Sequence, residues 1–198
     1  MELTLEHIGK KYQGHWLFKD INLSLQSGQS LSITGKNGSG KSTLMQVIYG
    51  LIQPSEGKVL IDGKSDFQAH SIMALSSPYM ELPMEFTIKE LHQLYFNLNK
   101  LSQSYEQFLE NAMFSVKDGN KPVKHFSSGM QQRLKTAFCL YSVAPVILLD
   151  EPLTNMDTSG EKWYKNCLSE VKYKICLVAG NQGAEIDWAD KNLTISGL

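Results

Sequence analysis

The feature that most constrains this chain is a glycine-rich loop that runs from Gly35 to Ser42 and reads GKNGSGKS. The apolar run 31–34 precedes the loop, and residues 43–49 continue at helical spacing as far as Gly50. Glycines allow consecutive backbone N–H groups to turn inward around phosphate oxygens, while the following helix offers its positive N-terminal end. This strand–loop–helix order therefore predicts a cradle for phosphate groups.

Two side chains at the end of the loop extend that prediction to ATP with Mg²⁺. Lys41 supplies a positive charge for the β- and γ-phosphates, and Ser42 offers a hydroxyl oxygen to the metal, which prefers hard oxygen ligands. The residues expected to bind the nucleotide are Gly35, Lys36, Asn37, Gly38, Ser39, Gly40, Lys41, Ser42 and Thr43.

A second chemical element follows the buried-strand pattern Val146–Leu149. Asp150 ends this run, where a carboxylate can hold the Mg²⁺ that Ser42 also contacts, directly or through water. Glu151 comes next and is placed to orient and polarise the water that attacks the γ-phosphate. An apolar run that ends in two acids is more often an ordinary strand end, but its position after the glycine-rich loop favours the catalytic interpretation.

The order of the remaining patterns indicates an α/β fold in one domain, residues 1–198, because the length suits a single core. Leu3–Ile8 and Ile21–Leu25 alternate like half-buried strands, with a turn-rich segment between them, and predict an antiparallel edge. Runs without alternation predict strands covered on both faces in a mainly parallel sheet. A mainly helical insertion is expected from about residue 80 to 140, with Thr87 and Glu90 as a capping box. The runs without alternation, which predict the strands of the parallel sheet, are 59–61, 72–75, 146–149 and 175–179.

Composition excludes several classes of function. Lys and Arg total 19 against 20 Asp and Glu, and Arg133 is the single arginine, so a nucleic-acid-binding surface is not expected. No apolar run reaches the roughly 18 residues that span a bilayer. Cys139, Cys167 and Cys176 lack metal-ligand spacing and are typical of idle thiols in a reducing cytoplasm.

The segment 126–133, FSSGMQQR, lies between the two chemical elements and resembles the signature of ABC ATPases, usually written LSGGQxQR. Ser127, Gly129, Gln132 and Arg133 match that signature. By itself such a run is also a common loop leading into a helix, but its order and spacing make it a strong indication here. Over nearly the whole chain the sequence is similar to the ATP-binding subunits of bacterial ABC transporters. Three positions are substitutions: Phe126, Ser128 and Met130.

The resemblance implies a P-loop NTPase fold, a head-to-tail dimer with a second ATP-binding subunit, and a transmembrane permease as partner. In such dimers the signature of one subunit covers the ATP of the other, a role that would fall on Ser127, Ser128, Gly129 and Met130. Tyr12 matches the aromatic residue that stacks on adenine, although a strand-end tyrosine can also pack on the core. Asp157 matches the acid of the interface loop and also suits a helix N-cap. The protein is then expected in the cytoplasm, on the inner face of the membrane through its partner.

Two positions depart from the family pattern. Where the family has a glutamine after the third strand, the nearest equivalent here is Ser77. Where it has a switch histidine, this chain has Asn181, whose amide can donate to the γ-phosphate but cannot carry a positive charge or exchange a proton. We therefore expect Asn181 to take part in catalysis and hydrolysis to be slow.

Three hypotheses stay open at this point. The first is an energy-coupling ATPase that docks on a permease through the helical insertion and the apolar segment from Pro78 to Phe86. The second is a soluble ABC-type ATPase without transport, which tandem cassettes, a coiled coil or a basic arm would favour. The third is a nucleotide-binding regulatory subunit with little turnover. The transported substance, its direction, and homodimer against heterodimer are not written in these residues.

Overall fold

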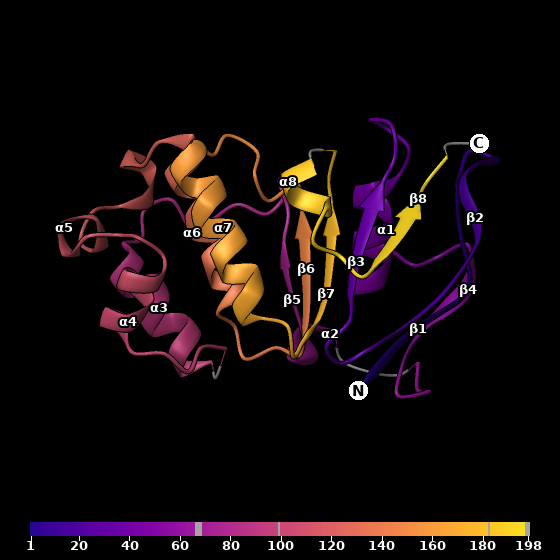
Figure 1. The fold of residues 1–198 in the computed structure, drawn as a ribbon, viewed down its shortest axis with the longest axis horizontal. Coiled ribbons are helices and arrows are strands. Elements are labelled where there is room, and N and C mark those ends of the chain that lie inside the picture. The colour runs from indigo at the N-terminus through magenta and orange to yellow at the C-terminus, as the bar shows by residue number, and fades with distance from the viewer. Residues whose placement is uncertain (66–68, 99, 182, 197–198) are drawn as a thin grey trace.

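The computed structural model describes residues 1–65, 69–98, 100–181 and 183–196. Two β-sheets and a group of helices lie side by side along the long axis of the molecule (Figure 1). One sheet is antiparallel with the strand order β2-β1-β4, and the other has the order β5-β6-β7-β3-β8. The strands are β1 (Glu2–Tyr12), β2 (His15–Gln26), β3 (Ser30–Thr34), β4 (Glu56–Ile61), β5 (Met73–Ser76), β6 (Val146–Asp150), β7 (Ile175–Ala179) and β8 (Lys191–Thr194).

The second sheet is parallel throughout its described pairings, as expected for an α/β fold. Strands β6 and β7 are buried at every position, which explains their unbroken apolar sequences. Ile72 was predicted in a strand but ends the short helix α2 (Ala69–Ile72), because pairing of β5 with β6 begins at Met73 opposite Val146.

The antiparallel hairpin β1–β2 is longer than its sequence pattern indicates. The turn consists of Gln13 and Gly14 alone, both with positive φ (50° and 86°), so the prediction of a turn-rich segment between Ile8 and Ile21 is wrong. The β1–β2 register shifts between Leu5 and Lys11, and these irregularities hide the alternation from which strands are recognised.

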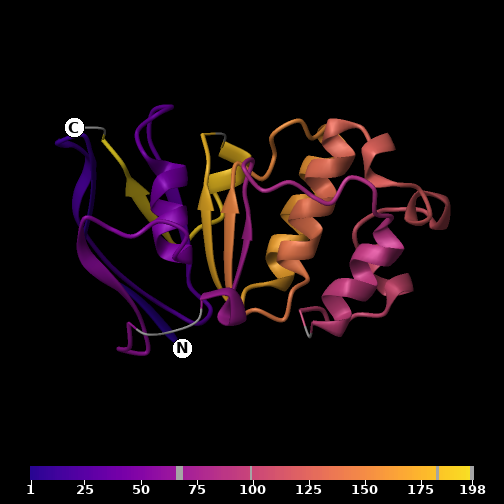
Figure 2. The ribbon, with the colours of Figure 1, turned by 180° about the vertical axis from the view of Figure 1, so that it is seen from behind.

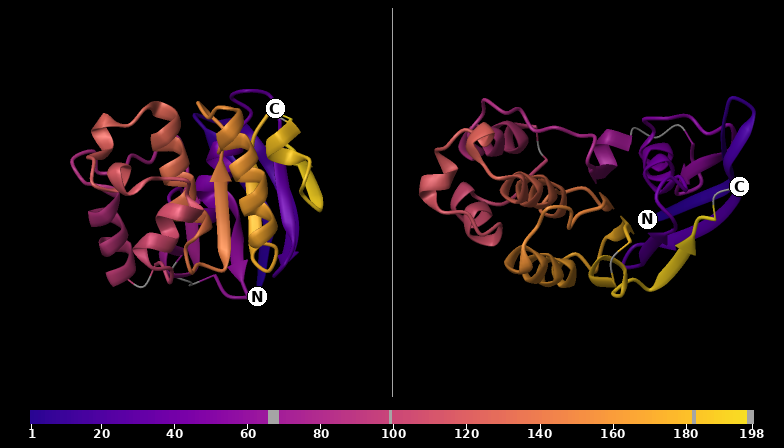
Figure 3. Two further views of the ribbon diagram at one scale, coloured as in Figure 1. Left: turned by 60° about the vertical axis from the view of Figure 1, so that its left-hand side comes forward. Right: turned by 90° about the horizontal axis from the view of Figure 1, so that it is seen from above.

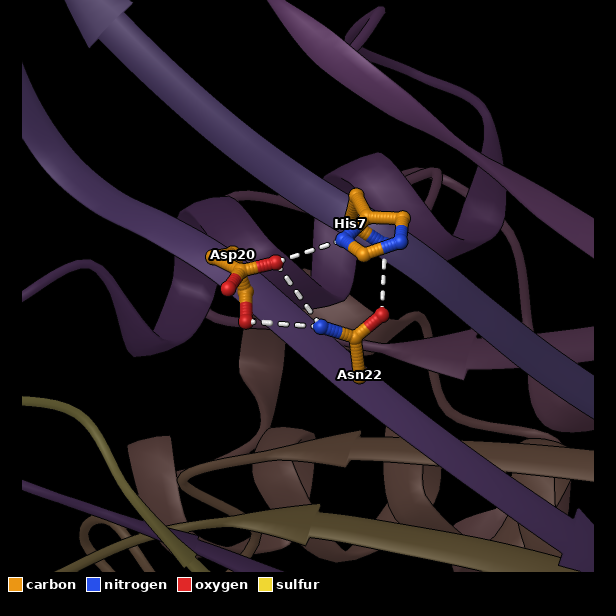
Figure 4. Close-up of polar contacts among 3 residues, drawn as sticks. All are labelled: His7, Asp20 and Asn22. Atoms are coloured by element: carbon orange, nitrogen blue, oxygen red, sulfur yellow. Dashed lines mark hydrogen bonds and ion pairs between the residues drawn. The ribbon is translucent and has the colours of Figure 1, made fainter.

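A polar network spans this irregular part of the hairpin (Figure 4). His7 and Asp20 both have left-handed backbone conformations, with φ of 50° and 56°. His7 Nδ1 and Asp20 Oδ1 lie 2.7 Å apart, and Asn22 Nδ2 donates to the same carboxylate oxygen at 2.8 Å. The His7 backbone N–H donates to Asn22 Oδ1 at 2.9 Å, so three side chains fix two unusual backbone turns.

Helices gather at the end of the molecule opposite the antiparallel sheet (Figures 1 and 2). Three of them begin with capping boxes: Thr87 with Glu90, Ser104 with Gln107, and Ser115 with Asp118; the first confirms the sequence prediction. This region, within residues 80–140, comprises α3 (Ile88–Asn97), α4 (Tyr105–Asn111), α5 (Val116–Gly119), the 3₁₀ helix η1 (Val123–His125) and α6 (Ser128–Leu140).

Alternate residues of the central strands serve two separate cores. Val146 and Leu148 of β6 pack with α1 (Lys41–Tyr49) and the antiparallel sheet, whereas Ile147 and Leu149 pack with α6, α7 (Thr158–Glu170) and the other helices. The two cores therefore lie on opposite faces of the parallel sheet (Figure 3). The short helix α8 (Gly183–Ile186) contacts β3 and β7. Across the described ranges, no helix is long and apolar enough to cross a membrane.

Candidate nucleotide-binding site

The glycine-rich loop connects β3 to α1 at the carboxyl end of the parallel sheet, where ligands bind in open α/β sheets. Glycine is required at both ends of the loop. At Gly35 (φ 148°), a Cβ atom would lie 2.4 Å from the Ile195 carbonyl oxygen, and at Gly40 (φ 105°) one would lie 2.7 Å from Leu17 Cγ. The loop is therefore held closely between β2, the segment after β8, and its own helix.

Lys41 folds back over this loop. Its side chain is buried, and Nζ donates to the carbonyl oxygen of Gly35 at 2.9 Å and to that of Lys36 at 3.4 Å. The Ser39 hydroxyl is also buried and has no hydrogen-bond partner among the described residues. A buried cation beside an unsatisfied hydroxyl suits an anionic ligand with several acceptor oxygens, which is what a phosphate chain provides.

Three of the residues that were predicted to bind the nucleotide lie toward the surface of the loop or of its helix. Lys36 and Asn37 are exposed, and Thr43 in the first turn of α1 is half-buried. Asn181, which follows β7, donates from Nδ2 to Asn37 Oδ1 at 2.8 Å. The structure thus brings Asn181, which was expected from the resemblance to donate to the γ-phosphate, to the glycine-rich loop.

Asp150 lies at the foot of the loop, at the end of β6. Ser42 Oγ donates to Asp150 Oδ1 at 3.1 Å and Ser77 Oγ donates to Oδ2 at 3.2 Å. Burial raises the pKa of the Asp150 carboxyl above its usual value, against the two hydrogen bonds, which lower it. Ser42 and Asp150 both offer oxygen atoms, the ligand type that Mg²⁺ prefers, so their side chains fit the predicted metal.

Ser77 enters the site through the register of the sheet. Ser76 of β5 pairs with Leu149 of β6, so the next residues of both strands, Ser77 and Asp150, lie together. The sequence identifies Ser77 only as the nearest equivalent of a missing glutamine. Its position two residues after the apolar run 72–75 was the available signal for a site residue.

Glu151 adopts a left-handed conformation with φ of 47°, which turns the chain away from β6. Its backbone N–H donates to the Ala179 carbonyl oxygen at 2.8 Å. Gln132 of α6 donates from Nε2 to the carbonyl oxygens of Glu151 and Pro152, both at 3.3 Å. The strained turn is therefore fixed from two sides, and it places a half-buried carboxylate beside Asp150.

Tyr12 stands apart from the loop at the tip of the hairpin, paired with His15. Its ring is half-exposed, 49% by accessible surface, and Lys10 Nζ lies 5.0 Å from the ring centroid. The hairpin end does approach the loop, since Leu17 of β2 lies against Gly40. An exposed aromatic face near the loop is compatible with stacking on a base and is not explained by core packing.

The signature segment begins α6 at the other side of the parallel sheet, and β5, β6 and β7 separate it from α1 (Figures 1 and 2). Ser127 caps α6 by accepting from the Met130 N–H at 3.2 Å, and Asp157 caps α7 by accepting from the Gly160 N–H at 2.8 Å. A Cβ atom on Gly129 would lie 2.6 Å from the Asn155 carbonyl oxygen, so the two segments need glycine there to meet.

A cavity of about 230 Å³ opens between these two helix starts. The first residues of both helices line it, and the positive end of a helix suits an anion, although the Asp157 carboxylate also lines the cavity. One chain therefore carries two half-sites, the loop with Asp150 and the signature cavity, and does not join them. The cavity is lined by Ser127, Ser128, Gly129, Met130, Arg133, Asn155, Met156, Asp157 and Gly160.

A second cavity, about 290 Å³, lies between β5, α3 and α6. Apolar and aromatic side chains form most of its wall, and the charged residues Lys100, Lys135 and Glu81 also line it. Neighbouring residues of the 78–86 segment remain exposed, with Tyr79 at 74% and Phe86 at 41%. Its apolar wall includes Tyr49, Met73, Met80, Leu82, Tyr95, Leu98 and Phe138.

Comparison with known proteins agrees with this geometry. The family described as ABC transporter matches residues 18–154. The teichoic acids export ATP-binding protein TagH of Listeria monocytogenes is 28% identical over 165 residues, 82% of this chain and 46% of TagH. The cytochrome c biogenesis ATP-binding export protein CcmA of Mesorhizobium japonicum is 32% identical over 167 residues, 81% of each chain. The chain thus spans less than half the length of TagH.

A solved structure shares the fold. The ATP-binding cassette MJ0796, in a dimeric post-hydrolysis state bound to ADP and Pi, aligns with a TM-score of 0.85 at 23% identity. The alignment covers 98% of this chain and 94% of MJ0796. The predicted fold class, an α/β P-loop NTPase core with an antiparallel β edge, is thereby confirmed.

Proposed function

Because this chain belongs to the ABC transporter family, we propose that it is an ATP-binding and ATP-hydrolysing subunit that powers a separate transmembrane permease. The observation that carries the proposal is the junction of the glycine-rich loop with Asp150. Ser42, in the first turn after the loop, donates to the carboxylate that ends the buried strand β6, which β7 separates from β3. This pairing supports a single site that combines a phosphate cradle, a metal-binding carboxylate and a second acid.

In this proposal the loop binds the β- and γ-phosphates through its backbone N–H groups. Lys41 exchanges its contacts with the Gly35 and Lys36 carbonyl oxygens for the phosphate oxygens, and Ser39 gains a partner for its buried hydroxyl. Ser42 and Asp150 hold Mg²⁺, which neutralises charge on the phosphates when bound. Tyr12 contributes its exposed ring to the base.

Glu151 accepts a proton from the attacking water and orients it toward the γ-phosphate. The fixed turn at Glu151 supports that role, because hydrogen bonds to Ala179 and from Gln132 hold its backbone. Thr154 Oγ1 donates to the carboxylate itself at 3.4 Å. Asn181 donates to the γ-phosphate from the far side of the loop. Its neutral amide stabilises less negative charge than a histidinium would, so turnover is slow.

The second half-site completes the first in a head-to-tail dimer. Ser127, Ser128, Gly129 and Met130 of one subunit cover the ATP held by the loop of the other, with Asp157 in the interface. The N-termini of α6 and α7 supply the donors and the positive ends for the γ-phosphate. The second subunit is either a copy of this chain or a related one.

The permease docks at the apolar cavity beside α3 and α6, which places the protein at the inner face of the membrane. The exposed aromatic and methionine side chains of residues 79–86 support this, since such residues are enriched in protein interfaces. TagH and CcmA are named as export proteins, which favours export as the direction of transport.

The experiment that tests the proposal compares phosphate release by the purified chain with that of Glu151→Gln. The variant keeps the shape of the side chain and loses its basicity, so hydrolysis should fall by about 10²-fold or more while ATP binding persists. Equal rates in the two proteins would exclude catalysis by Glu151. Absence of ATP binding by the parent chain would refute the proposal as a whole.

A further inference from the structure

Asp150 has a hydrogen-bond partner that belongs to a longer chain of contacts. Ser77 is buried, and its hydroxyl both donates to Asp150 Oδ2 at 3.2 Å and accepts from the Tyr79 N–H at 3.4 Å. Its carbonyl oxygen accepts from the Met80 N–H at 3.0 Å. The position of the Ser77 hydroxyl therefore depends on how the backbone of residues 77–80 is held.

A lysine holds that backbone from the side of α6. Lys135 Nζ donates to the Ser77 carbonyl oxygen at 3.5 Å, and the side chain is half-buried. Burial lowers the pKa of the Lys135 ammonium, and the Glu81 carboxylate acts in the opposite direction. Burying a cation costs more free energy than burying a neutral side chain unless its contacts compensate. The hydrogen bond from Lys135 to the Ser77 carbonyl oxygen is such a contact.

The same ammonium faces the cavity that the proposed permease would enter. Lys135, Glu81 and Met80 all line its wall, beside apolar groups from α3 and β5. A group that enters the cavity thus meets Lys135 and Met80, and the N–H of Met80 donates to the Ser77 carbonyl oxygen. No such link between the cavity and the metal site follows from the glycine-rich loop or the signature.

We infer that Lys135 is a positioning residue for the metal site. It fixes the Ser77 backbone, Ser77 orients the Asp150 carboxylate toward Mg²⁺, and an occupant of the cavity alters both through the ammonium. This inference rests on the proposed function, because it assumes that Asp150 holds Mg²⁺ bound with ATP. It adds a role for a residue outside the nucleotide site, one of the charged residues that line the cavity together with Lys100 and Glu81.

The test measures how much Mg²⁺ improves nucleotide binding. A fluorescent ATP analogue is titrated into the purified chain in excess EDTA and in saturating Mg²⁺, and the ratio of the two affinities is taken. Lys135→Met keeps the length of the side chain and removes the charge. Ser77→Ala removes the hydroxyl on Asp150, Lys135→Arg restores a cation, and Lys117→Met removes an exposed lysine of α5 as the matched control.

The variants are expected to lower only the ratio of the nucleotide affinity in Mg²⁺ to the affinity in EDTA. Ser77→Ala should lower it about tenfold and Lys135→Met about threefold or more, since residues that orient metal ligands commonly change metal affinity by such factors. Binding in EDTA should stay within twofold of the parent, and Lys135→Arg and Lys117→Met should keep the parent ratio. Circular dichroism spectra of the variants verify that each is folded.

Three outcomes would overturn the inference. An unchanged ratio in Lys135→Met with a reduced one in Ser77→Ala would show that Ser77 acts without the lysine. Equal losses in EDTA and in Mg²⁺ would show a purely structural effect on the nucleotide site. A parent chain that binds the analogue equally with and without Mg²⁺ would remove the metal role of Asp150 and the positioning role with it, whereas a parent that does not bind the analogue at all would refute the proposed function.

Discussion

At the scale of single residues, the hairpin network of His7, Asp20 and Asn22 shows how side chains stabilise an unfavourable backbone (Figure 4). The hydrogen bond with His7 lowers the pKa of the exposed Asp20 carboxyl, and a second bond from Asn22 adds to this. Among residues other than glycine, asparagine, aspartate and histidine adopt left-handed conformations most often, so both Asp20 and His7 suit this backbone. The bonds of His7 to Asp20 and Asn22 add to that preference.

The pH dependence of that network gives a prediction for Asp20→Asn. The pKa of Asp20 is lower in the folded state than the value of about 3.9 typical of unfolded chains, so ionisation stabilises the fold above that pH. This contribution is lost as the pH falls through the folded-state pKa. Asp20→Asn should therefore lower the melting temperature at pH 6, and the difference from the parent should shrink toward pH 3. A difference that is constant with pH would contradict the prediction.

Single residues also show where the sequence is a sufficient guide. Lys41 and Ser42 were predicted from a local loop motif, and Asp150 from a strand end whose position after that loop favoured a catalytic role; Ser42 and Asp150 are in contact in the structure. Ser77 and Gln132 contribute through β5–β6 register and through the packing of α6 on the Glu151 turn. Those relations are tertiary, so the sequence pattern around Ser77 or Gln132 marks the residue but does not indicate the contact that it makes.

At the scale of elements, the start of α3 is fixed by a capping box that the sequence predicts. The Glu90 N–H donates to Thr87 Oγ1 at 3.2 Å, and the Thr87 N–H donates to Glu90 Oε2 at 2.8 Å. Thr87→Ala should destabilise the protein by about 1 kcal/mol, the usual cost of an N-cap loss. Urea denaturation measures this, and Thr87→Ser, which keeps the hydroxyl, should retain most of the stability. If Thr87→Ala and Thr87→Ser lose equal stability, the methyl group of Thr87 and not its hydroxyl provides the stabilisation.

Elements of the hairpin were harder to predict than those of the parallel sheet. Uninterrupted apolar runs such as Val146–Leu149 and Ile175–Ala179 identify buried strands directly. In β1 and β2 the register shifts displace side chains from one face to the other, so a periodicity of two fails between Ile8 and Ile21. The helical region was predicted because helix caps and 3.6-residue spacing are local signals, whereas the packing of α6 against β5 is not.

At the scale of the whole molecule, the two half-sites lie on opposite sides of the strands β5, β6 and β7 (Figure 1). A chain with this arrangement cannot apply its signature helix to its own loop without crossing its central sheet. Two chains related head to tail can join each loop to the signature cavity of the other. The proposed dimer is therefore a geometric requirement of the proposed composite site, and it should form only when ATP occupies the loops.

This requirement predicts the mass of the Glu151→Gln variant in solution. Without hydrolysis, ATP and Mg²⁺ should convert it from monomer to dimer, as measured by light scattering after size-exclusion chromatography. Adding Lys41→Met, which weakens phosphate binding, or Ser128→Tyr, which fills the exposed start of α6, should each abolish the dimer. A mixture of these two double variants contains one intact composite site per mixed pair and should recover part of the dimer. Dimers that persist without ATP, or no recovery on mixing, would mean that loop and signature do not meet across two chains.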